Sequence, residues 1–557
     1  MKTSLPPAIA AEVAAACDDW SQSKKIARLW NRDKTLWTSA DEDKWLGWLD
    51  IAERQFAQRR RFEDIAREVK SKGYRDAVLL GMGGSSLCPE VLALTFGRQE
   101  EFPALHILDS TDPAQVKAIE GIADPKTSLY IVSSKSGSTL EPNIFHQYFY
   151  EKSGRDGSRF IAITDPGSKM EKIAKEQNFG LICYGDPSIG GRYSALSDFG
   201  MVAGAAMGLD VPQFLEGAVG MTQLCRGEDA AKNPGVSLGL ALGTLAKRGH
   251  DKVTLIASPA IFDVGAWLEQ LIAESTGKNG KALIPVDREA VGAPEVYGND
   301  RVFVYLRYSA RYEPEQDEAV DRLEAAGQPV IRLEIADTYE LGAEFFRWEI
   351  AVAVAGAVIG INPFDQPDVE ASKIATRKLT DEFEKTGKLP EEKPMLEDSG
   401  LKFFTDDANA DVLEGGTAEE LLRSHFDRLA GGDYCALLAF MRMNAAHEDA
   451  LAGIRLAIRD RKKVATCLGF GPRFLHSTGQ AYKGGPNSGV FLQITCDDAQ
   501  DVAIPEQRYT FSVVKAAQAR GDFDVLAERR RRVLRVHLPA DVKQGLETLR
   551  SAIEKGL

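Results

Sequence analysis

Glu274 is the residue whose neighbours in the sequence most strongly suggest chemistry. It lies in the stretch WLEQLIAESTGKNGK (267–281), in which Trp267, Gln270, Leu271 and Glu274 recur at i, i+3, i+4 and i+7. A helix would place these four side chains on one face, and the two apolar ones predict that this face points inward. Carboxylates are rarely buried without a partner. Glu274 is therefore either a core carboxylate paired with an arginine or a catalytic base.

Two loops could hold the oxygens of a phosphate group. GMGGSS at 81–86, with Gly84 and Ser85, follows a predicted strand and opens a predicted helix, but it lacks the lysine of a P-loop. SSKSGST at 133–139 offers five hydroxyls and one ammonium group directly after another strand. Backbone N–H groups, hydroxyls and a helix N-terminus can together bind a phosphate. The alternative for each loop is a turn without a ligand.

A permanent cation follows in the motif GGRYS at 190–194, where Arg192 is suited to oxyanions; a structural arginine is the alternative. The net charge of -14 and the pI of about 5.2 argue against nucleic acid or an anionic membrane as a partner. An acidic protein that binds an anion must gather positive groups in one pocket. The candidates are Lys135, Arg192, Lys373 and His476.

The pattern of strands and helices predicts an α/β protein with two tandem, doubly wound parallel sheets and an N-terminal helical layer. A chain of 557 residues suggests roughly two to four domains. Short apolar runs followed by polar turns and helical patterns are typical of parallel strands covered on both faces. The predicted parts are a helical segment at 1–72, a first α/β domain at 73–245, and a second at 246–557 with a charged surface excursion near 378–416.

The predicted strands are short and apolar. In the first domain one begins at Asp76, and the others lie at 104–110, 128–134 and 159–164. In the second domain they lie at 252–259, 281–286, 301–308, 329–335, 433–441, 463–471 and 490–495.

Cysteine and histidine usage predicts neither a disulfide framework nor a metal site. The seven cysteines and seven histidines are dispersed and form no CxxC, HxH or HExxH motif, which suits reduced thiols in a cytoplasm. No apolar run reaches the 18 or so residues of a membrane helix, and the N-terminus lacks a convincing signal peptide. We expect a cytoplasmic protein without metal, cofactor or membrane contact.

Six motifs together resemble the sugar isomerase (SIS) domain family, and within it the glucose-6-phosphate isomerases. GMGGSSL, SSKSGSTLEP, GGRYS and AESTGKNGK occur in the order of the hexose-phosphate-binding and base segments of that family. NPFDQPDVEASK at 362–373 and LHSTGQ at 475–480 agree. The resemblance covers about 75–500 and is greatest to the isomerase half of bacterial fusions of transaldolase with glucose-6-phosphate isomerase, although no transaldolase barrel is present.

The resemblance implies a metal-independent aldose–ketose isomerisation of glucose 6-phosphate to fructose 6-phosphate through a cis-enediolate, in glycolysis and gluconeogenesis. It also implies a role for each matching residue. Glu274 would move a proton between C1 and C2, Arg192 would stabilise the enediolate, His476 and Lys373 would assist ring opening, and Gln270 would contact the sugar oxygens. The sugar phosphate would be held by Gly84, Ser85, Ser134, Lys135, Ser136 and Thr139.

The same resemblance implies a homodimer, because the histidine of this family is contributed across the dimer interface. The usual order of its last two motifs is reversed here, since Lys373 precedes His476. Two alternatives stay open: an isomerase that also accepts mannose 6-phosphate, and a non-catalytic SIS sensor of sugar phosphates. Association with a separate transaldolase is a further possibility.

Overall fold

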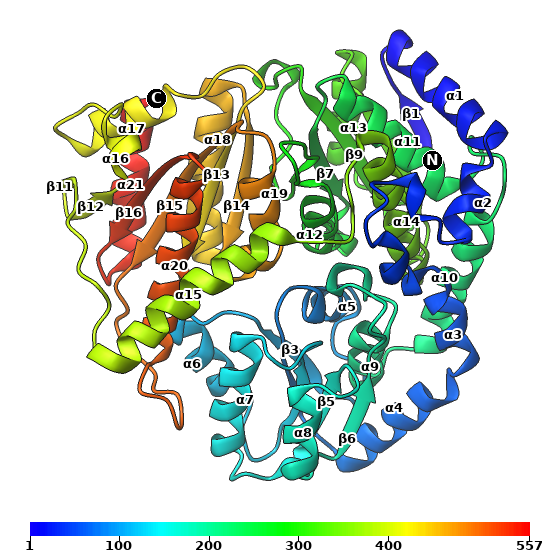
Figure 1. Cartoon of the computed structure of the whole chain (residues 1–557), viewed down its shortest axis with the longest axis horizontal. Coiled ribbons are helices and arrows are strands. Elements are labelled where there is room, and N and C mark those ends of the chain that lie inside the picture. The colour runs from blue at the N-terminus through cyan, green and yellow to red at the C-terminus, as the bar shows by residue number, and fades with distance from the viewer.

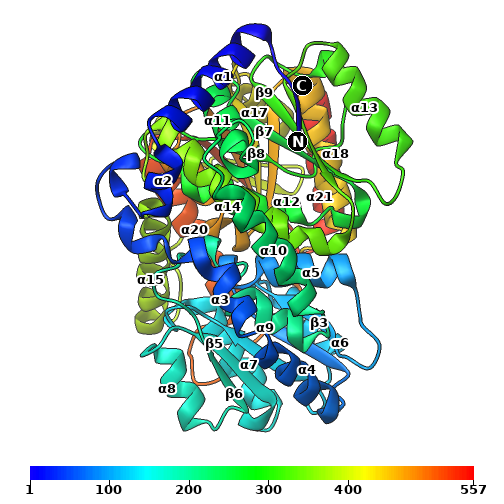
Figure 2. The ribbon, with the colours of Figure 1, turned by 90° about the vertical axis from the view of Figure 1, so that its right-hand side faces the viewer.

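The computed structural model describes all 557 residues and arranges the strands in three sheets (Figure 1). The predicted α/β class with parallel sheets is confirmed. The number of sheets differs from the two predicted, because 246–557 contains two sheets instead of one. In both views the first sheet lies below the other two (Figure 2).

The first sheet has the order β3-β2-β4-β5-β6, and all its strands are parallel. Three of its strands are buried along their whole length, as expected where helices cover both faces. The strands are β2 (Asp76–Leu80), β3 (Ala104–Leu108), β4 (Leu129–Ser133), β5 (Phe160–Thr164) and β6 (Leu181–Tyr184). The accompanying helices are α5 (Leu87–Phe96), α6 (Pro113–Ile122), α7 (Leu140–Lys152), α8 (Lys169–Glu176) and α9 (Asp198–Ala206).

The second sheet has the order β1-β10-β9-β7-β8, in which only β1 is antiparallel to its neighbour. Its strands are β1 (Lys2–Ser4), β7 (Lys252–Ala257), β8 (Ile284–Val286), β9 (Arg301–Tyr308) and β10 (Val330–Ile335). The N-terminal segment is therefore not entirely helical, since its first residues form the edge strand of this sheet. Its helices are α1 (Pro7–Gln22), α2 (Lys25–Trp30), α3 (Ile51–Ala57) and α4 (Arg60–Lys72).

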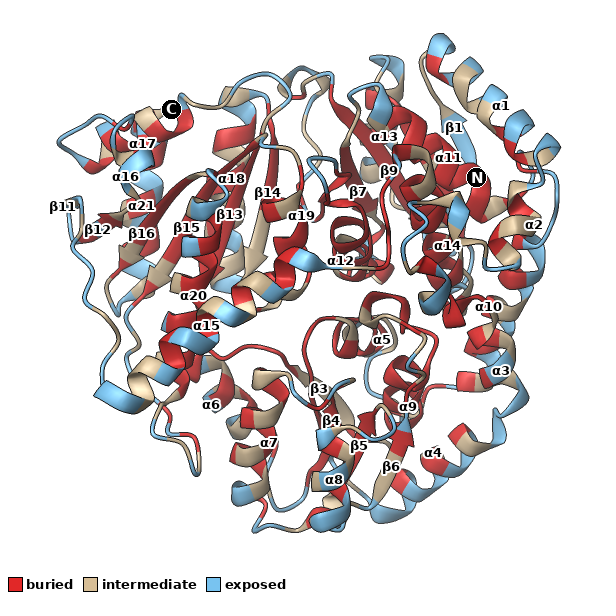
Figure 3. Cartoon of the chain, in the orientation of Figure 1, coloured by how far each residue is buried: buried red, intermediate tan, exposed pale blue.

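Four further helices accompany these two sheets. They are α10 (Val211–Cys225) and the largely buried α11 (Pro234–Lys247), α12 (Val264–Thr276) and α14 (Leu341–Ile359), while α13 (Pro314–Ala325) lies nearer the surface. α11 and α14 are in close contact at Gly239. A β-carbon at this position would lie only 2.4 Å from the carbonyl oxygen of Ala351, so a residue with a side chain would force the helices apart. Figure 3 shows the strands of all three sheets as largely buried.

The third sheet has the order β11-β12-β16-β15-β13-β14. Its strands are β11 (Leu396–Asp398), β12 (Leu401–Phe404), β13 (Tyr434–Phe440), β14 (Ala465–Phe470), β15 (Gly489–Cys496) and β16 (Arg532–Leu538). The predicted excursion at 378–416 supplies β11 and β12, which pair antiparallel at one edge. The helices are α16 (Asp407–Ala410), α17 (Ala418–Phe426), α18 (Ala445–Lys462), α19 (Gly479–Gly484), α20 (Phe511–Glu528) and α21 (Val542–Gly556).

The connection to the third sheet is α15 (Pro367–Thr386), which runs diagonally past the ends of the first and third sheets (Figure 1). Apolar core clusters lie on both faces of the third sheet. One is separate from the rest of the core, and the other packs the opposite face of the sheet against α12 and β8. The third sheet thus packs against the helix that carries Glu274. None of the helices is both long enough and apolar enough to span a membrane.

Candidate functional site

α12 carries Glu274 on an inward face, as its sequence pattern predicts. Trp267, Gln270, Leu271 and Glu274 are all buried, and Glu274 is only 7% exposed. Trp267 packs edge-on against Phe345 of α14, with ring centroids 4.5 Å apart. The apolar residues of this face therefore fix the helix and bring the Glu274 carboxylate into the interior of the protein.

The Glu274 carboxylate is held by two neighbours. Arg192 Nη1 lies 3.2 Å from Glu274 Oε1, and the side-chain amide of Gln270 donates a hydrogen bond of 3.1 Å to Glu274 Oε2. The structure shows the carboxylate paired with an arginine, and the role of Glu274 as a base stays a prediction.

Arg192 is rigidly placed, since every nitrogen of its guanidinium group has a protein acceptor. Nε donates to Ser275 Oγ at 2.9 Å and Nη1 donates to Gln366 Oε1 at 2.9 Å. Nη2 donates to the carbonyl oxygens of Pro363 and Asp365, both at 2.8 Å. The motif at 362–373 therefore anchors this arginine through its first residues. The anchoring of Arg192 by these residues could not be predicted from the sequence, because backbone carbonyl groups of a loop carry no sequence signature.

A second buried cation lies next to this arginine. Lys278 Nζ contacts Asp365 Oδ1 at 2.8 Å and donates to the carbonyl oxygen of Asn362 at 2.6 Å. Burial, followed by the charge of Arg192, lowers the pKa of Lys278 to about 7. Lys278 is therefore only partly charged near neutral pH, and Arg192 is the principal cation beside Glu274.

The glycine-rich turn at 81–86 packs directly against the loop of Arg192. It forms a short 3₁₀ turn, Gly83–Ser85, between β2 and α5. A β-carbon on Gly84 would lie 2.1 Å from the carbonyl oxygen of Gly191, so no other residue fits there. Ser85 lies in the same turn and is buried. The structure explains Gly84 by close backbone contact, whereas its contact with a phosphate stays a prediction.

We therefore expect Gly84→Ala to separate the two loops and displace Arg192. Overpacking of this kind costs about 1–3 kcal/mol of stability, and a displacement of about 1 Å at a reacting group can cost about 100-fold in rate. Gly190→Ala is the matched control, because a β-carbon at Gly190 meets no atom within 4 Å. Thermal unfolding and isomerase assays of both variants test this. Equal behaviour of the two variants would contradict it.

His476 belongs to the same network and comes from the same chain. The Gln270 amide donates to the backbone carbonyl oxygen of His476 at 2.8 Å. His476 Nε2 lies 3.0 Å from Glu141 Oε1, which also accepts a 2.6 Å hydrogen bond from Gln518. A carboxylate can only accept, so Nε2 carries the proton and Nδ1 is left as the basic nitrogen. Burial raises the pKa of the Glu141 carboxyl group, but His476, a backbone hydrogen bond and Lys373 together outweigh burial, so this pKa lies below its usual value.

A cavity of about 390 Å³, here called cavity A, opens beside His476. It joins the loop after β4 and the N-terminal turn of α7 to α15. Its lining includes Ser136, Ser138, Thr139, Glu141, Lys169, Lys373, Arg377, His476 and Gln518. Lys373 Nζ lies 3.6 Å from Glu370, and its side chain is 40% exposed. Ser136, Thr139, Lys373 and His476 are therefore brought together despite the reversed order of their motifs.

The remaining predicted residues lie outside cavity A. Lys135 Nζ is 2.5 Å from Asp165 and donates to the carbonyl oxygen of Asp186 at 3.3 Å. Ser134 is buried, and its hydroxyl group has no hydrogen-bond partner. Cavity A is not lined by Glu274, Gln270 or Arg192. These residues are linked to it by the hydrogen bond from Gln270 to the backbone of His476, which does line the cavity.

Several residues of cavity A were not predicted. Glu141 stands in the quoted motif SSKSGSTLEP and could have been chosen as a partner for a histidine. Lys169 is the first residue of α8, whose N-cap Ser168 accepts a hydrogen bond from the backbone N–H of Glu171. Arg377 lies one turn after the predicted Lys373 on α15, and this spacing could have indicated it, whereas Gln518 comes from the distant helix α20 and carries no local signal. No group of three or more His, Cys, Asp or Glu side chains is placed so that it could hold a metal ion.

Comparison with known proteins identifies relatives that match part of this chain. Residues 53–293 match the family model described as phosphoglucose isomerase. A glucose-6-phosphate isomerase of Rubrobacter xylanophilus is 31% identical over 365 residues, covering 56% of this chain and 84% of the relative. One of Methanocaldococcus jannaschii is 26% identical over 350 residues, covering 56% of this chain and 86% of the relative. Lys373 and His476 lie outside the residues matched by the family model.

Solved structures show the same fold. The glucose-6-phosphate isomerase of Chlamydia trachomatis superposes with a TM-score of 0.52 at 19% identity, covering 66% of this chain and 79% of that one. A hypothetical protein of Thermus thermophilus gives a TM-score of 0.57 at 22% identity, covering 68% of this chain and 99% of that one.

Proposed function

This chain belongs to the phosphoglucose isomerase family, and we propose that it interconverts glucose 6-phosphate and fructose 6-phosphate. The observation that carries the proposal is the pairing of a buried carboxylate, Glu274, with a fully anchored guanidinium group, Arg192, beside cavity A. A base next to a fixed cation is what proton transfer at a carbon beside a carbonyl group requires. Relatives named glucose-6-phosphate isomerase support the choice of substrate.

In this mechanism Glu274 removes the proton from C2 of the open-chain aldose and returns it at C1. The electrons of the broken C2–H bond form a C1–C2 double bond and move charge onto the carbonyl oxygen O1, and this enediolate is stabilised by the positive charge of Arg192. The proton of the C2 hydroxyl group passes to O1, so that protonation at C1 gives the ketose. Gln270 holds the second oxygen of the carboxylate and so fixes which oxygen faces the substrate. Because Arg192 is already bound by four acceptors besides Glu274, little reorganisation accompanies the developing charge.

Ring opening is assigned to His476, with Lys373 nearby. Glu141 fixes the tautomer that leaves Nδ1 of His476 basic, so this nitrogen can exchange a proton with a ring or hydroxyl oxygen. Lys373 lines cavity A with a half-exposed side chain that can reach a substrate oxygen. Both residues come from the same chain as Glu274. In this assignment the histidine and Glu274 belong to one chain, and the homodimer, the transaldolase association and the cytoplasmic location stay predictions.

The phosphate group is assigned to the loop at 136–139 and the N-terminus of α7. Its hydroxyls and the first backbone N–H groups of a 13-residue helix suit phosphate oxygens. Lys169 and Arg377 also line cavity A, and neither forms an ion pair with a carboxylate. Lys135, in contrast, is engaged by Asp165. We infer that Lys169 and Arg377 supply the charge opposite the phosphate, while Lys135 holds the loop in place.

We expect Lys169→Gln and Arg377→Gln each to raise KM for glucose 6-phosphate by about tenfold with little change in kcat, because each removes one charge-assisted contact. Lys135→Gln should raise KM less and lower the melting temperature more, since Asp165 loses its partner. Steady-state kinetics and thermal unfolding of the three variants test this. A larger rise in KM for Lys135→Gln than for Lys169→Gln would contradict the assignment.

The test of the proposed function is direct. Purified protein is incubated with glucose 6-phosphate, and with mannose 6-phosphate in parallel, and the products are followed by NMR. Formation of fructose 6-phosphate from glucose 6-phosphate alone is the expected result, whereas equal conversion of mannose 6-phosphate would establish the broader isomerase. Binding of either sugar phosphate without conversion would identify a sensor.

A further inference from the structure

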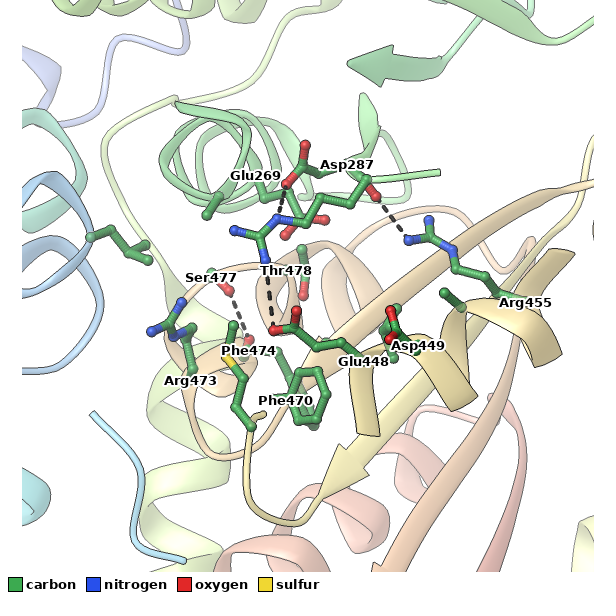
Figure 4. A pocket seen from close by; sticks show the side chains of 17 residues that line it. Glu269, Asp287, Glu448, Asp449, Arg455, Phe470, Arg473, Phe474, Ser477 and Thr478 are labelled. Carbon is green, nitrogen blue, oxygen red and sulfur yellow. Dashed lines mark hydrogen bonds and ion pairs between the residues drawn. The ribbon is translucent and has the colours of Figure 1, made fainter. Parts of the chain in front are cut away.

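The 3₁₀ turn Arg473–His476, which carries the histidine of the site, is not fixed by close packing alone. Figure 4 shows this turn beside α12, where a second cavity of about 210 Å³ lies between them. The cavity is lined by Glu269 of α12, by Phe474 of the turn, and by Ser477 and Thr478 directly after it. Polar contacts must therefore place the turn on this side.

Two of these polar contacts do not involve α15. The side-chain amide of Gln270 on α12 donates to the backbone carbonyl oxygen of His476 at 2.8 Å. Arg473 donates to Glu90 on α5 at 2.6 and 2.7 Å, and to Asp109 directly after β3 at 3.0 Å. These contacts tie the turn to α12 and to the first sheet. They leave open its position relative to α15, which carries the lysine of the site.

Gln480 joins this segment to both helices. It is the second residue of α19, four residues after His476, and its side chain is completely buried. Its Oε1 accepts hydrogen bonds from the backbone N–H groups of Asp368 at 2.9 Å and Val369 at 3.3 Å. Its Nε2 donates to the carbonyl oxygen of Gly277 and to Asp368 Oδ2, both at 2.9 Å. Gly277 ends α12, whereas Asp368 and Val369 begin α15.

The start of α15 depends on Gln480 because its own N-cap residue is engaged elsewhere. The first N–H groups of a helix are commonly bound by the side chain of the N-cap residue. Here that residue is Gln366, whose Oε1 accepts instead from Arg192 Nη1 at 2.9 Å. Pro367 has no N–H group, and Gln480 binds the next two. Arg192 and Gln480 thus hold the start of α15 from two sides.

The backbone around Gln480 leaves little room for a compensating shift. A β-carbon at Gly277 would lie 2.2 Å from the Cα atom of Ala481, and one at Gly484 would lie 2.4 Å from Asp368 Oδ2. α19 is therefore in direct contact with the end of α12 and with the start of α15. A glutamine amide has two N–H donors and two acceptor lone pairs, and all four are used here.

We propose that Gln480 is a positioning residue of the isomerase site, which sets the places of Lys373 and His476 relative to Glu274 through its hydrogen bonds to α15 and α12. The inference rests on the proposed function, because it gives Gln480 a part in the same reaction. Gln480 does not line cavity A and acts through the helices that it joins. Ring opening and proton transfer occur on one substrate molecule, so a shift of one set of groups against the other must slow the reaction.

Gln480→Met removes all four hydrogen bonds with little change in side-chain size. We expect kcat for glucose 6-phosphate to fall about 100-fold, as a displacement of about 1 Å can cause. KM should rise less than about tenfold, because the attraction between charges falls only slowly with distance. Gln55→Met is the matched control, since Gln55 is buried and donates to Asp198 at 2.8 Å outside the site. It should lower the melting temperature without lowering kcat.

Hydrogen–deuterium exchange tests the same contact without an activity assay. In Gln480→Met the backbone N–H groups of Asp368 and Val369 lose their acceptor. The peptide covering 366–373 should therefore exchange faster than in the wild type, as measured by mass spectrometry. Gln55→Met should leave the exchange of this peptide unchanged.

A second variant, Gln480→Glu, allows a rescue that a purely structural role would not give. The glutamate keeps an acceptor for α15 but turns an oxygen instead of Nε2 toward the carboxylate of Asp368, so kcat should fall. Adding Asp368→Asn restores a donor to this contact, and the double variant should recover kcat about tenfold over Gln480→Glu, as one hydrogen bond to a charged group can supply. Asp368→Asn alone should not raise kcat.

Conversion of glucose 6-phosphate by the wild type separates the two claims. If the wild type is active and Gln480→Met keeps both its kcat and its exchange at 366–373, the positioning role is wrong and the proposed function stands. Failure of Asp368→Asn to raise the kcat of Gln480→Glu would also overturn the positioning role. Absence of conversion by the wild type would overturn the proposed function, and the positioning role with it.

Discussion

Glu274→Gln is expected to reduce kcat for the isomerisation of glucose 6-phosphate by about 100- to 10,000-fold, which is the range that general acid–base groups contribute. The amide keeps the size of the side chain and can still contact Gln270, but it cannot accept a proton from carbon. Binding of fructose 6-phosphate, measured by calorimetry, should change by less than about tenfold, since the proposed phosphate contacts lie in cavity A.

Glu274→Asp separates the two roles of this carboxylate. It keeps the charge next to Arg192 but withdraws it by one methylene group, so kcat should fall while the melting temperature is largely retained. If Glu274→Gln isomerises at the wild-type rate, Glu274 is only the structural partner of Arg192, and the base lies elsewhere in the site.

Arg192→Lys is expected to lower kcat by about 100- to 1,000-fold, comparable to the loss of one oxyanion donor. A lysine keeps the charge, but its single ammonium group cannot serve Ser275, Gln366 and the two loop carbonyl oxygens at once. The cation would then no longer be held beside Glu274, and the loop at 362–366 would lose its anchor. KM should change less than kcat, because this contact strengthens only as charge develops.

Arg61→Lys is the matched control for Arg192→Lys. Arg61 also bridges two groups, Gln55 and the buried Asp198, but it lies outside the site. Both variants should be less stable than the wild type, whereas only Arg192→Lys should lose kcat. A loss of the same size in both variants would show that Arg192 acts through stability alone.

The periodic parts of the sequence predicted the structure well. The strands at 301–308 and 329–335 appear at 301–308 and 330–335, because continuous apolar runs bounded by turns leave few other arrangements. The inward face of α12 was likewise predicted, since Trp267 and Leu271 can be buried together only if Glu274 is turned inward as well. Hydrophobic periodicity specifies which face is buried, and this information is local.

Sheet membership could not be predicted in the same way. The strands of the third sheet have the same apolar pattern as those of the second, and strand pattern does not encode which neighbours a strand pairs with. The break between them is α15 and the segment that follows it. Its charged composition predicted a surface excursion, whereas part of it forms the edge strands β11 and β12.

The site shows the same limit at the level of side chains. Lys135 was placed correctly after a parallel strand, but the direction of its ammonium group depends on Asp165, thirty residues further along. Gln518 reaches cavity A from a helix whose own sequence gives no reason to choose it, whereas Arg377 lies one turn after the predicted Lys373 on α15 and could have been chosen for that spacing. The loops that hold a ligand are predictable from local sequence, whereas the partners that aim each side chain come from distant segments.

Exchange of the C2 hydrogen of glucose 6-phosphate with D₂O tests the central claim most directly, with EDTA present and with wild type and Glu274→Gln compared. Proton transfer by Glu274 predicts deuterium at C2 of the recovered glucose 6-phosphate with the wild type, and none with the variant, although both bind the sugar phosphate. Binding without exchange by the wild type, or exchange at the same rate in Glu274→Gln, would contradict the account.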